Sequence, residues 1–409
     1  MNDRRQSPAV PPDVASSTQR RRWFGLLGLA GLASALWLGV PAGLAADAPH
    51  TAKQPSVAWT PPQEAPLGAP VTPSAPKGQE RLRLAVLSDL NGSYGSLTYG
   101  PDVHAATRAL IGSLRPDLVL ITGDMVAGQR RGLDYGAMWR GFHQAVTEPL
   151  GRAGISIAPT PGNHDASPAA PFTVERQEYA RQWKAADRVP QVQFLDNSQY
   201  PFHYSFEYGG VFFASIDAAA VGPIGDNQRR WLERQLSATQ AAVKIVFGHL
   251  PVYPFAAKRE REVLADDALA EVLNRQAVTA YISGHHHAYY PGVVDGVRHI
   301  AMPCLGGGPR RLLGQARRSP SALVVLEIEG DEVTILEALR APEFTSPIVR
   351  GELPNQVAFG SERILRDDHA GLAPLWVDQT SQVAFWEQPS VTRPVTASRS
   401  GSQVDPSSR

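Results

Sequence analysis

Between residues 81 and 340, short apolar runs alternate with segments of mixed apolar and polar residues. The apolar runs predict buried strands, and the mixed segments have the apolar spacing of helices that cover a sheet. The predicted strands are 82–87, 118–122, 155–158, 243–247, 278–282, 298–302, 322–328 and 333–338, with a hairpin at 202–216. The predicted helices are 103–114, 135–150, 226–238 and 262–274. This alternation is typical of an α/β fold.

Five of these predicted strands end next to a residue that can bind a metal ion. They are followed by Ser88-Asp89, Gly123-Asp124, Gly162-Asn163, Gly248-His249 and Gly284-His285. In open α/β sheets, ligands bind at the carboxyl ends of strands, where the connecting loops converge. We therefore expect these five side chains to gather along one edge of the sheet.

The predicted site combines carboxylate, amide and imidazole groups without a thiolate, which suits Mn, Fe or Zn. The candidate metal ligands are Asp89, Asp124, Asn163, His249, His285 and His287, with Asn91 as a further candidate. So many donors exceed the need of one tetrahedral zinc and favour two divalent ions that share a carboxylate. His285 and His287 would face one side of an extended segment, whereas His286 would point away and is not expected to bind.

Such a site has a definite chemical use. Two divalent ions can hold a bridging hydroxide and stabilise both oxygens of an in-line displacement. Two carboxylates balance only half of the charge of two such ions, which leaves positive charge for an anionic phosphate. His164 follows the candidate ligand Asn163 but is aimed elsewhere. It is therefore the candidate for steadying the developing charge or protonating the leaving oxygen.

Five motifs, in this order, resemble those of the calcineurin-like metallophosphoesterases: Ser88-Asp89-Leu90-Asn91, Gly123-Asp124 with Gly128, Gly162-Asn163-His164-Asp165, Gly248-His249 and Gly284-His285-His286-His287. The resemblance covers roughly residues 81–339 and implies a four-layer α/β/β/α sandwich of two facing mixed β-sheets. It also implies the roles of the candidate site residues. Asp89 and His287 would bind a first metal, Asn163, His249 and His285 a second, Asp124 would bridge them, and His164 would be catalytic.

The first motif departs from the family pattern, because Asn91 stands where the family usually has histidine. An amide oxygen can still bind a hard or borderline ion, so we expect Asn91 to hold the first metal more weakly. Purple acid phosphatases also lack this histidine, but they supply a tyrosine three residues after the second-motif aspartate. Ala127 occupies that position here, so tyrosinate–iron chemistry is not expected.

The leading functional hypothesis is a phosphomonoesterase that acts on a small-molecule phosphoester by attack of a metal-bridging hydroxide on phosphorus. One alternative is a phosphodiesterase or nucleotide-cleaving hydrolase, which would use the same two-metal core. An alternative of another class is a non-catalytic metal- or ligand-binding protein whose first site has decayed at Asn91. The 39 basic and 39 acidic residues balance, so the charge indicates no nucleic-acid partner. No feature of the sequence indicates an oligomeric state.

Two further features have an ordinary structural interpretation. Cys304 is the only cysteine, which excludes an intrachain disulfide, and it is expected to be a buried, inert thiol. The charged run at 258–262 is expected to be the solvated start of the predicted helix 262–274. It also follows His249 closely enough for one of its cations to reach the substrate.

The ends of the chain differ from its middle. Residues 1–48 resemble a twin-arginine signal, in which Arg21 and Arg22 precede an uncharged stretch and Ala46-Asp47-Ala48 fits a cleavage site. An uncleaved membrane anchor is the alternative, because the uncharged stretch 23–40 is just long enough to cross a bilayer. The remaining parts are a Pro-rich linker at 49–80, a catalytic domain at 81–340, a C-terminal wrapping segment at 341–385 and a disordered tail at 386–409.

This organisation predicts a periplasmic or secreted protein that is exported already folded. Replacing Arg21 and Arg22 by Lys should therefore retain the protein in the cytoplasm. Cell fractionation and N-terminal sequencing of the exported wild type provide the measurement. A mature chain that begins near Ala46 or Pro49 is expected, whereas an intact Met1 in the membrane fraction would contradict cleavage.

Overall fold

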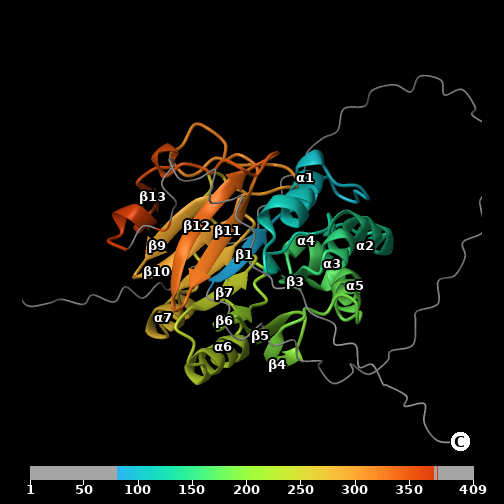
Figure 1. Cartoon of the computed structure of the whole chain (residues 1–409), viewed down its shortest axis with the longest axis horizontal. Helices are drawn as coiled ribbons and strands as arrows, with labels where there is room; N and C mark the ends of the chain where they lie inside the picture. The colour runs from blue at the N-terminus through green and yellow to red at the C-terminus, as the bar shows by residue number, and fades with distance from the viewer. Residues whose placement is uncertain (1–80, 373–374, 376–409) are drawn as a thin grey trace, which may run out of the picture. The chain divides into compact units, whose positions relative to one another are not determined.

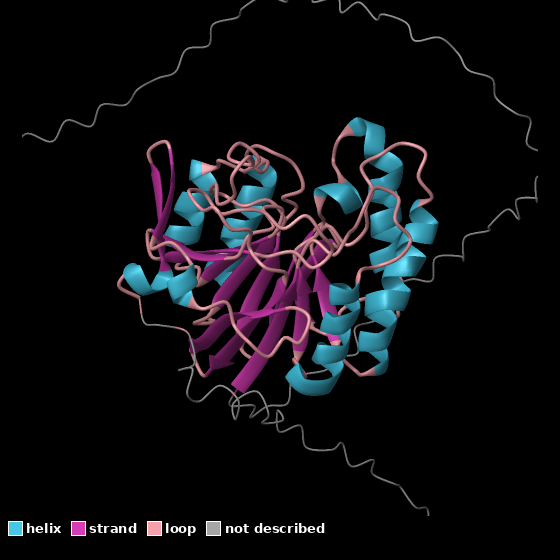
Figure 2. Ribbon diagram, turned by 90° about the horizontal axis from the view of Figure 1, so that it is seen from above, coloured by secondary structure: helices cyan, strands magenta, loops and turns pink. Residues whose placement is uncertain are grey.

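A computed structural model describes residues 81–372 and residue 375, and its strands form two β-sheets (Figures 1 and 2). The predicted signal, the linker and the C-terminal tail lie outside the described residues. One sheet has five strands in the order β12-β11-β1-β2-β3, and the other has nine in the order β13-β14-β9-β10-β8-β7-β6-β5-β4.

The five-stranded sheet carries three parallel strands side by side. β1 pairs with β2 and β2 with β3, and Leu87 lies opposite Ile121, which lies opposite Pro159. The carboxyl ends of these three strands are therefore level with one another. The sheet comprises β1 (Arg81–Leu87), β2 (Leu118–Ile121), β3 (Ser156–Pro159), β11 (Ala322–Glu329) and β12 (Glu332–Arg340).

The nine-stranded sheet has a parallel centre, in which β6, β7, β8 and β10 follow one another. The predicted hairpin is confirmed as β5 and β6, which turn at Gly209 and Gly210, both with positive φ. β13 and β14 extend the sheet beside β9 and belong to the segment predicted to wrap around the domain. The strands are β4 (Gln193–Gln199), β5 (His203–Tyr208), β6 (Val211–Ser215), β7 (Lys244–Gly248), β8 (Ala280–Ser283), β9 (Tyr290–Val294), β10 (Val297–Ala301), β13 (Gln356–Phe359) and β14 (Glu362–Arg366).

The sheets pack face to face, and helices cover their outer faces (Figure 2). On β6, Phe213 points into the core shared with the five-stranded sheet, whereas Phe212 and Ala214 pack towards α6 and α7. This alternation follows from the two-residue period of a strand. The four-layer α/β/β/α sandwich is therefore confirmed. The helices are α1 (Pro101–Ala109), α2 (Tyr135–Phe142), α3 (Glu148–Arg152), α4 (Asn163–Ala166), α5 (Thr173–Trp183), α6 (Asp226–Ala238) and α7 (Asp267–Arg275).

The helix predicted at 262–274 begins later than expected, at Asp267. The side chain of Asp266 accepts a hydrogen bond from Leu269 N at 3.0 Å and so caps the first turn of α7. Residues 262–266 consequently form a loop that is free to contact other parts of the chain. Among the described residues, none of the helices has the length and apolar character needed to span a bilayer.

Candidate metal centre

The structure brings the predicted site residues together where the two sheets meet. Asp89 and Asp124 follow β1 and β2, and Asn163 and His164 begin α4 after β3. His249 follows β7, while His285 and His287 follow β8. The prediction of one sheet edge was therefore wrong, because the carboxyl ends of strands from both facing sheets enclose the site.

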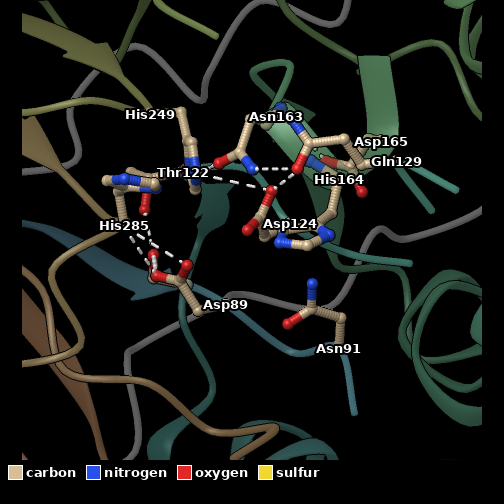
Figure 3. A network of polar contacts seen from close by, with 12 residues as sticks. Asp89, Asn91, Thr122, Asp124, Gln129, Asn163, His164, Asp165, His249 and His285 are labelled. Carbon is tan, nitrogen blue, oxygen red and sulfur yellow. Dashed lines mark hydrogen bonds and ion pairs between the residues drawn. The ribbon is translucent and has the colours of Figure 1, made fainter. Parts of the chain in front are cut away.

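One half of the site is built around Asp124, His249 and His285. These three residues can each offer one ligand atom such that all three atoms lie within 4.8 Å of one another. His249 Nε2 lies 3.4 Å from Asp124 Oδ1 and 2.8 Å from Asn163 Oδ1 (Figure 3). Asp124 and His249 are buried, whereas Asn163 and His285 are half-buried and form the more exposed side.

The other half is built around the fully buried Asp89. His287 Nε2 lies 3.0 Å from Asp89 Oδ1, and the backbone N–H of His285 donates to Asp89 Oδ2 at 3.1 Å. Asn91 is 8% exposed, and its amide is turned towards Asp124 and His164 (Figure 3). Its Nδ2 atom donates to Val126 O over 3.4 Å. Asn91 thus borders the site, and its role as a ligand stays a prediction.

Four candidate ligands have left-handed backbone conformations. The φ angles are 50° at Asp89, 57° at Asp124, 63° at His285 and 49° at His287. A non-glycine residue in this region costs about 1–3 kcal/mol and persists only where the surrounding structure enforces it. Here the sharp turns follow the ends of β1, β2 and β8, so part of the backbone strain in the described residues is located at the site.

Charge is balanced locally within the site. Burial raises the pKa of Asp124, but His249 and His164 outweigh it and hold that pKa below its usual range. Burial lowers the pKa of His249, yet the neighbouring carboxylates of Asp124 and Asp89 outweigh it and raise that pKa to about 9. The buried carboxylates therefore require positive charge beside them, which divalent ions can supply in place of imidazole protons.

The donor set fits divalent metal ions. Carboxylate oxygens, an amide oxygen and imidazole nitrogens converge within hydrogen-bonding distance of one another, and two of the groups are buried acids. His286 is different, because its Nδ1 accepts hydrogen bonds from the backbone of Phe255 and Ala256 and it points away from the cluster. The sequence-based exclusion of His286 from the ligands agrees with this geometry.

His164 stands at the border of the cluster. Its backbone N–H donates to Asp124 Oδ1 at 2.8 Å, and its ring Nδ1 lies 3.3 Å from Gly128 O. The ring of Tyr94 lies 5.2 Å from the His164 ring, between centroids, and Tyr94 is 54% exposed. The His164 ring therefore lies between the exposed Tyr94 and the buried Asp124 (Figure 3).

Two residues that support the ligands were missed by sequence reasoning. Gln129 Oε1 accepts a hydrogen bond from Asn163 Nδ2 at 3.0 Å, which turns the Asn163 oxygen towards His249. The backbone N–H of Gln129 is held in turn by the buried carboxylate of Glu175 at 2.5 Å, and burial raises the pKa of Glu175 to about 7. No local sequence signal marks either residue, because both act across long sequence separations.

The part of the chain that carries the candidate site residues also resembles known proteins. Residues 82–289, just over half of the chain, match the family described as calcineurin-like phosphoesterase. The chain belongs to this family. Serine/threonine-protein phosphatase CPPED1 of mouse (Mus musculus) is 24% identical over 212 residues, which are 47% of this phosphoesterase and 60% of the mouse protein. The chain thus spans about 60% of the length of this curated relative.

Three solved structures show similar folds at low sequence identity. Purple acid phosphatase PPD1 from yellow lupin (Lupinus luteus) is 16% identical, with a TM-score of 0.47, over 64% of this chain and 51% of its own. GAP50 of Plasmodium, described as the anchor in the inner membrane complex, is 20% identical, with a TM-score of 0.47, over 64% of this chain and 84% of its own. PhoD is 10% identical, with a TM-score of 0.46, over 78% of this chain and 77% of its own. With TM-scores below 0.5, these likenesses say nothing about the substrate.

A cavity lies away from the cluster in the described part of the chain. It has a volume of about 650 Å³ and opens beside the starts of β2 and β3, near Asp117, Ser156 and Trp183. Its described lining contains acids and arginines but no histidine or cysteine. The ligand-rich cluster at the opposite ends of these strands is therefore the better candidate for catalysis.

The packing around Gly162 generates a prediction. A Cβ atom at Gly162 would lie 2.2 Å from Asp124 N and 2.3 Å from Asp124 Oδ1. Gly162→Ala should therefore push Asp124 away from Asn163 and weaken metal binding by roughly 10-fold or more, measured by calorimetric titration of the metal-free protein. Gly151→Ala is the matched control, because a Cβ there meets nothing within 4 Å. Equal metal affinity of the two variants would contradict this account of Gly162.

Proposed function

We propose that this protein is a two-metal phosphomonoesterase that acts in the periplasm or outside the cell. The supporting observation is the convergence of oriented donor groups from five strand ends into one partly buried cluster. The proposed location is supported by the N-terminal sequence alone. Family membership supports hydrolysis of a phosphoester, and the charge of the site supports a preference for monoesters.

The residues divide into two ligand groups in this proposal. Asp89 and His287 would hold one ion, Asn163, His249 and His285 would hold the other, and Asp124 would contribute to both. When bound, the two ions would activate a water molecule for attack on phosphorus and neutralise the charge of the phosphate. The protein contributes the spacing, since every donor is attached to the end of a rigid strand or the helix that follows it.

His164 is proposed to act on the leaving group. Its Nδ1 atom lies 3.3 Å from Gly128 O, a group that can only accept a hydrogen bond, so Nδ1 carries hydrogen. This leaves Nε2 as the nitrogen that would meet the substrate in this proposal. In the protonated imidazole, Nε2–H can donate to the leaving oxygen and transfer its proton as the P–O bond breaks.

Charge favours a monoester over a diester. A phosphomonoester is largely dianionic near neutral pH, whereas a diester carries one negative charge. The buried acids Asp89 and Asp124 balance only half of the charge of two divalent ions, so the more highly charged substrate is matched better. The mouse relative is named a serine/threonine-protein phosphatase, which also hydrolyses a monoester, and this supports the same class here.

The first test is metal dependence with a paired substrate panel. Exhaustive chelation should abolish hydrolysis of p-nitrophenyl phosphate, and Mn, Fe or Zn should restore it. Under the same conditions, bis-p-nitrophenyl phosphate should be cleaved more slowly. Activity that survives chelation would remove the two-metal proposal, while faster cleavage of the diester would replace the monoester assignment by a phosphodiesterase.

The second test concerns His164. His164→Ala should lower kcat by roughly 10²–10⁴-fold, the range typical of a lost general acid, while the bound metal stays at the wild-type level. The loss should be smaller for substrates with good leaving groups, which need less protonation. His104→Ala is a control for an exposed histidine outside the cluster. Loss of both metals from the His164 variant would instead show a structural role.

A further inference from the structure

Each candidate metal-binding imidazole has one ring nitrogen held from outside the cluster. His249 Nδ1 lies 2.8 Å from Thr122 O, and His287 Nδ1 lies 3.2 Å from Gly308 O. Carbonyl oxygens only accept hydrogen bonds, so both Nδ1 atoms carry hydrogen and both Nε2 atoms are the ones that can offer a lone pair to an ion. Such outer contacts fix the tautomer and the ring orientation of metal-binding histidines.

His285 is held in the opposite sense and by a different kind of group. Its Nε2 atom lies 3.0 Å from Glu262 Oε2, a carboxylate oxygen that accepts the ring hydrogen. The Nδ1 atom is therefore the nitrogen left to bind an ion. His285 is also the member of the candidate triad with Asp124 and His249 that comes from the more exposed side.

Glu262 is itself fixed from two sides. Its carboxylate forms an ion pair with Arg259, one turn earlier in the same loop. Its backbone oxygen accepts a hydrogen bond from His286 Nε2 at 3.1 Å, while His286 Nδ1 accepts from Phe255 N at 3.2 Å. His286, which follows His285 in the sequence, thus holds the loop that carries Glu262, the hydrogen-bond partner of His285.

We propose that Glu262 is a positioning residue of the metal centre, whose carboxylate presents His285 Nδ1 to the ion that Asn163 and His249 also bind. Arg259 holds the carboxylate, and His286 holds the loop. This inference rests on the metal centre proposed above. It gives two members of the charged run at 258–262 a role other than contact with substrate, because Arg259 is paired with Glu262.

The test measures metal binding directly. Metal-free wild type, Glu262→Ala, Glu262→Gln and Glu260→Gln are each titrated with Zn²⁺ by calorimetry, and each is unfolded in urea without metal. Glu262→Ala should weaken the affinity for one of the two ions by roughly 10–100-fold, the usual effect of losing an outer partner of a metal ligand. Glu262→Gln keeps an acceptor oxygen and should lose less affinity. The other ion and the urea midpoint of the metal-free protein should stay as in wild type.

The controls separate the possible failures. Glu260 lies in the same loop and accepts from Lys258 N at 3.0 Å, so Glu260→Gln should bind both ions as wild type does. Wild-type affinity for both ions in Glu262→Ala would overturn the positioning role while leaving the metal centre intact. Equal losses in Glu262→Ala and Glu260→Gln would also overturn it. Failure of the wild type itself to bind Zn²⁺ would refute the proposed function, a result distinct from these.

Discussion

Two buried carboxylates set the main physical constraint on this structure. Asp89 and Asp124 follow neighbouring parallel strands, and their exposed fractions are 0% and 2%. Two acids so close together cannot both stay ionised in a dry interior unless positive charge lies beside them. Imidazoles from the second sheet meet this need at His249 and His287. The packing of the two sheets against each other thus brings the histidines that offset the charge of the two carboxylates.

Close packing explains why glycine precedes so many of the ligands. A Cβ at Gly284 would lie 2.2 Å from Ser88 Oγ and 2.7 Å from Asp89 Oδ2. Gly123 has a φ of 92°, a backbone conformation that glycine adopts at little cost and that other residues rarely adopt. The backbone loops therefore pack directly against the candidate ligand side chains. In this phosphoesterase, the repeated glycine–ligand pairs supply space as much as they supply flexibility.

Most of the regular elements could be predicted because their signals are local. The apolar runs at β1, β2 and β7 are short, buried on both faces and followed by polar ligands, and helix α6 was predicted with its observed bounds. Weakly patterned elements were not recognised. The strand β4, with its mostly exposed residues, carries no clear apolar alternation, and helix α5 has little contrast between its faces.

By itself, the sequence determined which residues could bind metal, because strand ends and donor types are readable along the chain. Only the tertiary structure decided that the donors come from two sheets, and which nitrogen of each imidazole faces inwards. Glu262 was predicted to start a helix, yet the Asp266 cap starts α7 later and leaves Glu262 beside His285. Gln129 likewise meets Asn163 only through folding. Such contacts join residues 23 and 34 positions apart, and hydrophobic periodicity carries no information about them.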